Sequence, residues 1–150
     1  MAEAFDDMLA RSIPQYEVMR GACLSLAGRF VQPRTDVVDL GCSRGEALAP
    51  LVEKYGASSC RFHGLEISEP MLEAARKRFS GGIKTGIVSV SKHDLRGGYP
   101  TFTASVTLSV LTLQFTPIEH RQRIVQNVFD RTLPGGAFLL VEKILGATHP

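Results

Sequence analysis

Cysteine is scarce in this sequence, and its placement argues against two common roles. The 150 residues contain three cysteines, Cys23, Cys42 and Cys60, at wide spacing. An odd number without a Cys-x-x-Cys pair predicts neither a disulfide framework nor a zinc site. The four histidines also lack the spacing of metal ligands, so we expect no bound metal.

Blocks of like charge and long apolar runs are missing as well. The 17 basic and 15 acidic residues are interspersed and leave a formal net charge of +2, so neither a nucleic-acid stripe nor a membrane-surface helix is predicted. No apolar run approaches the roughly 20 residues that span a bilayer, and the first residues lack the pattern of a secretion signal. We therefore expect a soluble, cytoplasmic protein of one domain, residues 1–150, that acts on a small molecule.

The sequence does contain a regular alternation of strand and helix patterns. Short apolar segments predict strands at residues 37–40, 61–66, 85–90, the first part of 103–113, and 137–141. Apolar residues at helical spacing predict helices at residues 14–30, 46–55, 68–79 and 116–133. This alternation predicts an α/β fold: a doubly wound, Rossmann-like parallel sheet of about five strands, with an N-terminal helical cap (1–33) on a core (34–150).

Capping residues and glycines predict where these helices begin and end. Glu46 is expected in the first turn of the helix after the first strand, where its charge suits the helix dipole. Ser80-Gly81-Gly82 is expected to stop the next helix. Thr116-Pro117-Ile118-Glu119 predicts a capping box with proline at the first helical position. Residues 96–102 hold two glycines and a proline, which predicts a loop or a single turn there.

The first predicted strand leads into a glycine-bounded loop, Gly41-Cys42-Ser43-Arg44-Gly45. Gly41 permits backbone angles that a side chain would forbid, and Gly45 would let a helix start close to the strand and a ligand. The open amides of that helix would then face a polar group of the ligand. We therefore expect a nucleotide-like ligand at this loop.

Other polar residues fall at the same edge of the expected sheet. Glu66 ends the second strand, at the distance from Gly45 that is typical of a carboxylate on a ribose diol. Asp94 follows the third strand, and residues 109–115 follow the fourth. Because ligands of such sheets lie beyond the C-terminal strand ends, we expect all of these residues to border one crevice.

The loop composition separates two kinds of adenosine ligand. The loop reads Gly-x-Ser-x-Gly around Ser43, which departs from the dinucleotide pattern Gly-x-Gly-x-x-Gly, and Asp39 lies two residues before Gly41. A carboxylate near the loop would repel a pyrophosphate but suit an ammonium group. Adenosine joined to an amino acid is therefore favoured over a nicotinamide dinucleotide. Ser43 has no assignable acid and histidine partners, which argues against a hydrolase.

These motifs resemble those of a known superfamily. Asp39-Leu40-Gly41-Cys42-Ser43, Glu66, His93-Asp94-Leu95 and Leu133-Pro134-Gly135-Gly136 are similar to the successive motifs of class I S-adenosylmethionine (SAM)-dependent methyltransferases. Further segments resemble one family within it, the carboxy-SAM synthases: Phe5-Asp6-Asp7-Met8, residues 11–16, residues 29–33, Thr112-Leu113-Gln114-Phe115 and Val141-Glu142-Lys143. That family makes a carboxylated SAM from SAM and prephenate, for modification of a tRNA wobble uridine. The similarity extends over nearly all of this sequence and about the N-terminal three-fifths of the family's length.

The resemblance implies a ligand and the residues around it. The ligand would be SAM, carboxy-SAM or S-adenosylhomocysteine. Gly41, Cys42 and Ser43 would lie against the methionine part, with Glu66 and Ile67 on the ribose. Asp94 and Leu95 would lie at the adenine. Asp39 and Gly45 join this set because of their places before and in the glycine loop. The predicted cofactor-binding residues are Tyr16, Asp39, Gly41, Cys42, Ser43, Gly45, Glu66, Ile67, Asp94, Leu95 and Ser109.

The resemblance to the family also assigns roles to Tyr16 and Ser109, and it points to an arginine that has no counterpart here. Tyr16 matches a tyrosine that helps to close the pocket. Ser109 stands where the family has an asparagine that faces the ligand. The family's arginine for the ligand carboxylate lies in a segment that this sequence does not contain, and Arg11, Arg44 and Arg96 are candidates to replace it.

The resemblance also predicts an incomplete sheet. Class I methyltransferases continue past the fifth strand into antiparallel strands, and without them residues 138–141 would form an open apolar edge. We therefore expect a truncated chain, or one completed by a homodimer or a partner chain. Three functions stay open: a carboxy-SAM synthase, an ordinary methyltransferase of a small molecule, and a non-catalytic SAM-binding module. No catalytic residue is predicted, because SAM carries its own leaving group.

Overall fold

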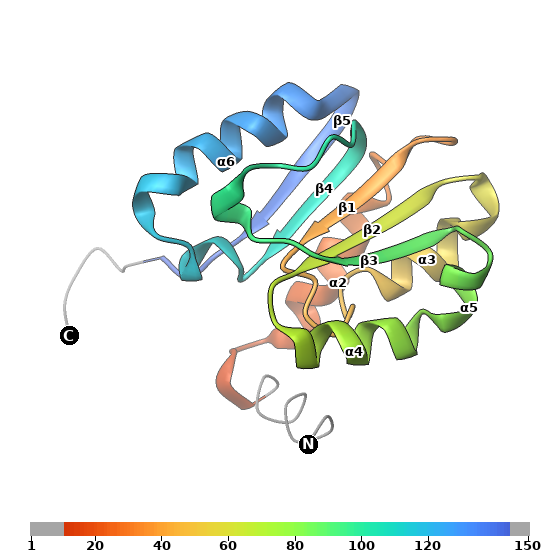
Figure 1. Cartoon of the computed structure of the whole chain (residues 1–150), viewed down its shortest axis with the longest axis horizontal. Coiled ribbons are helices and arrows are strands. Elements are labelled where there is room, and N and C mark those ends of the chain that lie inside the picture. The colour runs from red at the N-terminus through yellow and green to blue at the C-terminus, as the bar shows by residue number, and fades with distance from the viewer. Residues whose placement is uncertain (1–10, 145–150) are drawn as a thin grey trace.

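A five-stranded parallel sheet forms the centre of the protein (Figure 1). The computed structural model describes residues 11–144, so the motif Phe5-Asp6-Asp7-Met8 lies outside the described residues. The strands are β1 (Asp36–Leu40), β2 (Arg61–Glu66), β3 (Val88–Lys92), β4 (Ala104–Val110) and β5 (Thr132–Val141). Their order is β3-β2-β1-β4-β5, and every neighbouring pair is parallel. The strand order reverses between β1 and β4, which confirms the predicted doubly wound fold.

Helices cover both faces of this sheet. They are α2 (Tyr16–Ala27), α3 (Ala49–Tyr55), α4 (Glu69–Arg78), α5 (Ser80–Lys84) and α6 (Ile118–Arg131). Single 3₁₀ turns occur at η1 (Gly56–Ser58), η2 (Leu95–Gly97) and η3 (Leu113–Phe115). Within residues 11–144, no helix has the length and apolar character needed to cross a membrane.

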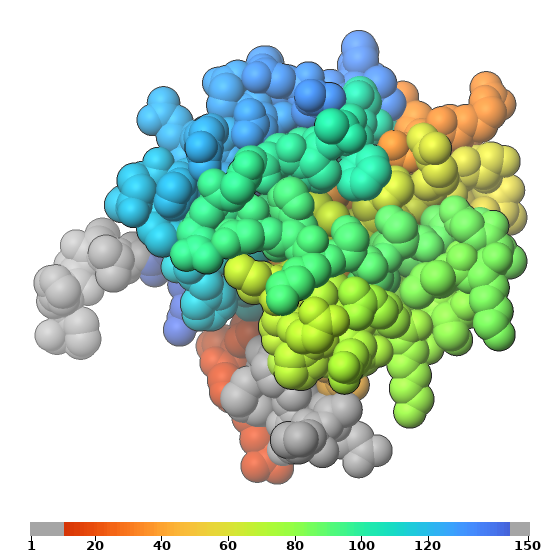
Figure 2. All heavy atoms as spheres, viewed as in Figure 1, coloured from red at the N-terminus to blue at the C-terminus, as the bar shows by residue number. Residues whose placement is uncertain are grey.

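Two apolar cores lie on opposite faces of the sheet. Ala27, Leu51 and Ala75 bring α2, α3 and α4 against one face, and Ile124 and Val128 bring α6 against the other. All five residues of β1 are buried, as expected for a central parallel strand. Between β3 and β4 the chain forms only η2 and a loop, as predicted, and this green segment crosses the centre of the face shown in Figure 2.

The predicted start of the helix after β1 is wrong. The chain passes through turns until α3 begins at Ala49, so Glu46 is outside the helix and not in its first turn. The reason is the loop itself: Gly41, Ser43 and Gly45 all have positive φ, at 72°, 50° and 85°, which a right-handed helix does not accommodate.

The helix predicted over residues 68–79 is confirmed as α4, which ends at Arg78 with Phe79 as its C-cap, just before Ser80-Gly81-Gly82. These three residues then begin a separate short helix, α5, that was not predicted, and β3 starts at Val88 and not at residue 85. A Cβ atom on Gly82 would lie 2.6 Å from Val88 Cγ2. Gly82 thus allows α5 to pack closely on the edge strand.

The boundaries of α6 and β5 differ in detail from the prediction. Pro117 is the N-cap of α6 and no side chain caps the helix, so the predicted capping box is absent from this helix start. The predicted strand 137–141 is confirmed. β5 already begins at Thr132, which pairs with Ala104, and the segment 133–136 forms an irregularity before Ala137 pairs with Val106. β5 is one of the two edge strands of the described sheet, and β3 is the other.

Candidate cofactor site

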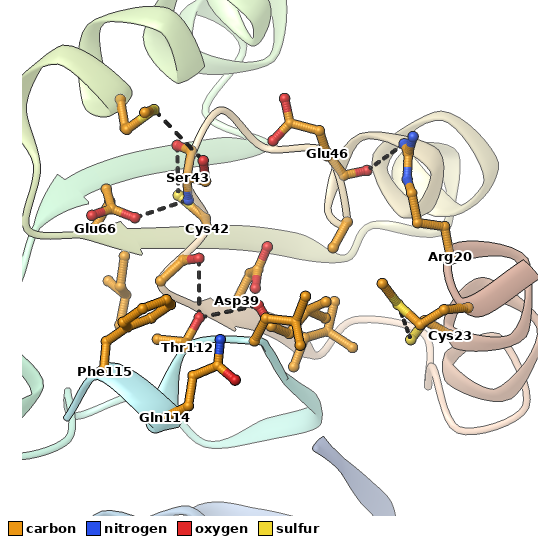
Figure 3. Close-up of a pocket in the computed structure, with 18 of the residues that line it drawn as sticks. Arg20, Cys23, Asp39, Cys42, Ser43, Glu46, Glu66, Thr112, Gln114 and Phe115 are labelled. Atoms are coloured by element: carbon orange, nitrogen blue, oxygen red, sulfur yellow. Dashed lines mark hydrogen bonds between the residues drawn. The ribbon is translucent and has the colours of Figure 1, made fainter. Parts of the chain in front are cut away.

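A cavity of about 1030 Å³ lies at the C-terminal edge of the sheet. Segments after β1, β2, β3 and β4 border it, together with one side of α2 (Figure 3). Nine of the eleven predicted site residues line it: Tyr16, Asp39, Gly41, Cys42, Ser43, Glu66, Ile67, Asp94 and Leu95. The structure therefore brings together residues from α2 and from the ends of three strands, as the parallel topology requires.

Main-chain hydrogen bonds fasten the glycine loop to the end of β2. The amides of Gly41 and Cys42 both donate to the carbonyl of Leu65, at 2.8 and 2.9 Å. A Cβ atom on Gly41 would collide with the side chain of Thr112, so this position requires glycine for space as well as for its positive φ. Gly45 does not line the cavity. It shapes the loop, because a Cβ atom there would collide with the ring of Phe79.

Glu66 is held in a fixed orientation by three backbone amides. Its Oε1 accepts hydrogen bonds from Ile67 N and Ser68 N, at 2.8 and 2.9 Å, and its Oε2 accepts one from Ser43 N at 2.9 Å (Figure 3). Because a carboxylate oxygen accepts about two hydrogen bonds, Oε2 retains one open position. A hydroxyl group in the cavity could donate to that position.

Asp39 is a buried carboxylate with an unsatisfied oxygen. The side chain lies at the end of β1 with 1% exposure, and Oδ2 has no hydrogen-bond partner. Burial, followed by the charges of Glu46 and Glu66, raises the pKa of Asp39 to about 7. A cation in the cavity would stabilise the ionised form and so satisfy this oxygen.

Asp94 lies at the β3 end of the cavity and is already paired. Arg96 donates to its carboxylate through Nε at 3.0 Å and through Nη2 at 2.6 Å, and the backbone amide of Arg96 donates at 2.9 Å. The hydrogen bonds from Arg96 lower the pKa of Asp94 to about 2. Of the three arginines proposed to bind a ligand carboxylate, only Arg96 lines the cavity, and it is committed to Asp94; Arg11 and Arg44 are not among the lining residues.

Ser109 does not face the cavity, which corrects the sequence prediction. Its side chain is fully buried, and its neighbours Leu108 and Val110 line the cavity in its place. Successive side chains of a strand point to opposite faces of the sheet, so a position flanked by two lining residues points away.

Sequence reasoning missed several lining residues, of which Arg20 and Cys23 on α2 are the clearest (Figure 3). Arg20 follows Tyr16 by one helical turn, and its guanidinium carbon lies 5.6 Å from the centre of that ring. The spacing of four residues places both side chains on one face of the helix. That periodicity was a signal available in the sequence once Tyr16 was assigned to the pocket.

The chain matches a known protein family and the fold of solved methyltransferase structures. The family described as "Methyltransferase domain" matches residues 37–136, and the chain belongs to this family. Solved structures agree in fold: TehB from Haemophilus influenzae has a TM-score of 0.65 at 18% identity, covering 79% of this chain and 38% of that one. The glycopeptide N-methyltransferase MtfA, complexed with SAM, has a TM-score of 0.64 at 18% identity, covering 79% and 48%.

The relatives with the higher sequence identity share one name, carboxy-SAM synthase. The chain is 36% identical over 146 residues to a carboxy-SAM synthase from Methylococcus capsulatus, covering 97% of this chain and 60% of the relative. It is 34% identical over 150 residues to the enzyme of the same name from Aeromonas salmonicida, covering 100% and 60%. The chain thus spans about 60% of the length of these relatives.

Proposed function

We propose that the protein binds SAM and forms the cofactor-binding part of a SAM-dependent transferase that resembles carboxy-SAM synthase. The observation that carries this proposal is Asp39: a buried carboxylate with an unpartnered oxygen, in the same cavity as the glycine loop and Glu66. SAM supplies two cationic centres, a sulfonium and an ammonium, to such a carboxylate. In a poorly hydrated cavity their attraction is stronger than in water.

The order of the strands gives the ligand a direction. Asp94 follows β3, Glu66 ends β2, and Asp39 lies in β1, and these three strands are neighbours in that order. With strands spaced ~4.8 Å apart, the distance from the end of β3 to the end of β1 is ~10 Å. We place adenine near Asp94, ribose near Glu66 and the methionine part near Asp39. The single open position on Glu66 Oε2 supports one hydrogen bond from a ribose hydroxyl.

The protein's own contribution to the chemistry is positioning. SAM supplies an activated carbon and its own leaving group, so the residues of this chain have to orient the ligand and exclude water. Cys42 does not act as a nucleophile in this proposal, because burial and the nearby carboxylates raise its pKa and keep the thiol protonated.

The cavity has room for a second small molecule. Its volume of about 1030 Å³ is at the upper end of the range for small-molecule sites, ~300–1,000 Å³. Gln114, Phe115 and Lys143 line the part that is bordered by η3 and the end of β5. We propose that a co-substrate binds there, and the sequence resemblance implies prephenate for this role.

A second chain is part of this proposal. β5 is an open edge of the described sheet, and the relatives are longer than this chain. We propose that a second copy or a partner chain covers this edge. Location in the cytoplasm and a role in tRNA modification stay predictions from the sequence.

Mass spectrometry of the small molecules released from the purified protein tests the proposal. Carboxy-SAM is the expected compound, and incubation with SAM and prephenate should then produce more of it. SAM or S-adenosylhomocysteine alone, with methyl transfer to a nucleophile in the absence of prephenate, would select the ordinary methyltransferase that the family match also supports. A nicotinamide dinucleotide would contradict SAM binding altogether.

A further inference from the structure

Arg20 lines the cavity, and its side chain extends from α2 toward the backbone carbonyl of Glu46, just after the glycine loop (Figure 3). Its Nη2 donates to the carbonyl of Glu46 at 3.3 Å, and its guanidinium lies over the ring of Tyr16. These contacts orient the side chain. Its ion pair with Glu17 is long, at 3.6 Å, and the Glu17 side chain is 77% exposed, so solvent screens that pair.

We propose that Arg20 binds the carboxylate of the ligand's amino-acid group and thereby makes the cavity selective for adenosines that carry a complete amino acid. This inference rests on the proposed binding of SAM and names the residue that recognises its methionine end. Arg20 is a specificity-determining residue in this account and takes no part in bond making or breaking.

The other cations of the cavity are less suited to this role. Among residues 11–144, three lysine or arginine side chains line the cavity: Arg20, Arg96 and Lys143. Arg96 binds Asp94 through several hydrogen bonds at the β3 end, where we place adenine. Lys143 follows β5, and its backbone amide contacts Gln114 on the co-substrate side. Of these three lining cations, Arg20 is the one that contacts the segment directly after the glycine loop, at Glu46.

The cavity offers one partner for each charge of an amino acid, Arg20 on α2 and Asp39 in β1. Cys23 lies one turn after Arg20, and Arg20, Cys23 and Asp39 all line the cavity (Figure 3). Arg20 also donates to the carbonyl of Glu46, which directly follows the glycine loop. The cavity thus holds a carboxylate for an ammonium group and a guanidinium for a carboxylate.

The geometry of arginine fits this task better than that of lysine. A guanidinium has five N–H donors in a planar fork, and Arg20 uses few of them within the protein. The remaining donors can bind a carboxylate through two parallel hydrogen bonds. The ring of Tyr16, 5.6 Å from the guanidinium carbon, adds a cation–π contact that helps to position the group.

Calorimetric titration with two ligands tests the inference on the 150-residue protein. SAM and decarboxylated SAM share the adenosine, the sulfonium and the amine, and differ only in the carboxylate. We expect the unaltered protein to bind SAM about 10- to 100-fold more tightly. Arg20→Met should remove most of this difference by weakening SAM binding, with less than about a twofold change for decarboxylated SAM. Arg20→Lys should retain part of the preference.

Arg29→Met is the matched control, because Arg29 is exposed just after α2 and does not line the cavity. It should leave both affinities unchanged. Equal weakening of both ligands by Arg20→Met, or an unaltered protein that does not discriminate between them, would overturn the role of Arg20 while leaving SAM binding in place. Failure of the unaltered protein to bind either ligand would contradict the proposed function itself.

Discussion

The β1–β2 side of the protein, which holds the predicted cofactor residues and is here called the cofactor side, differs from the β4–β5 side in how far its side chains are covered. On the β1–β2 side, Glu66 accepts three backbone hydrogen bonds and Asp39 is 1% exposed. On the β4–β5 side, large apolar side chains face solvent: Phe115 is 82% exposed, Ile118 78% and Phe129 75%. The carboxylates of the cofactor side are thus buried or held by backbone amides of this chain, whereas the β4–β5 side presents apolar surface and an open strand edge of the kind that other protein segments cover.

Glu66→Ala should have the largest effect on the cofactor side. The change removes the acceptor of three backbone N–H groups as well as the proposed ribose contact. We expect the free energy of unfolding to fall by about 3 kcal/mol, measured by urea denaturation, and SAM binding to be abolished. Glu66→Gln, which keeps one carbonyl oxygen, should be intermediate in both its free energy of unfolding and its SAM affinity. Unchanged SAM affinity in Glu66→Ala would refute the ribose assignment.

Gly41→Ala should have the next largest effect, and Gly86 provides a matched control for it. Gly41 and Gly86 have nearly the same φ, 72° and 75°, but a Cβ atom would collide with Thr112 at Gly41 and meet nothing within 4 Å at Gly86. Gly86→Ala should cost about 1 kcal/mol for the positive φ alone, and Gly41→Ala about 3 kcal/mol because Thr112 must also shift. If both substitutions lower the free energy of unfolding by the same amount in urea denaturation, the contact with Thr112 contributes nothing to stability.

The pH dependence of ligand binding tests the charge of the cofactor side. The folded protein holds the pKa of Asp39 at about 7, above its ordinary value of 3.8, so the stability that Asp39 contributes is present at low pH and is lost as pH rises toward 7. A cationic ligand needs the ionised form. SAM affinity should therefore rise with pH, by at most about tenfold per unit, and level off above pH 7.

Asp39→Asn is the control for this titration, because it removes the ionisable group and keeps the shape of the side chain. The variant should bind SAM more weakly, and its affinity should not change over the same pH range. A variant with the pH profile of the unaltered protein would assign the titration to another group, and Glu46 and Glu66 are then the nearest carboxylates to substitute.

The smallest effect is expected on the β4–β5 side. Phe129→Ser replaces an exposed ring on α6 that lines a shallow apolar hollow beside β5. The free energy of unfolding should change by less than about 0.5 kcal/mol in dilute protein, and SAM affinity should stay the same. If a second copy covers this side, sedimentation should show weaker association of the variant. A loss of stability above about 1 kcal/mol at every protein concentration would show that this surface belongs to the monomer's own core.

The same contrast explains what the sequence could and could not predict. Apolar strands β1 and β2 with carboxylates at their ends follow from local pattern, and so do Asp39, Glu66 and Asp94 at one edge of a parallel sheet. The late start of α3 depends on three alternating positive-φ positions, Gly41, Ser43 and Gly45, and serine rarely adopts this conformation. No local pattern marks such a position.

Other differences arise from tertiary contacts. Gly82 is needed where α5 packs on Val88, so its role depends on a neighbour that comes later in the chain. Ser109 occupies a position typical of a ligand contact, but the register of β4 points its side chain away from the cavity. Arg20 follows Tyr16 by one helical turn, so its place in the cavity depends on which face of α2 packs toward the loop, and no local motif marks that face.

The central claim, that the cavity binds SAM through a buried carboxylate that loses its proton, is tested most directly by calorimetry of SAM at pH 7 in two buffers of different ionisation enthalpy. With the pKa of Asp39 at about 7, part of the protein carries a proton there before the ligand binds. We predict that SAM binds with release of a fraction of a proton, and that nicotinamide dinucleotide binds far more weakly. Binding of SAM with the same heat in both buffers would contradict the role of Asp39, and tighter binding of the dinucleotide would contradict the account as a whole.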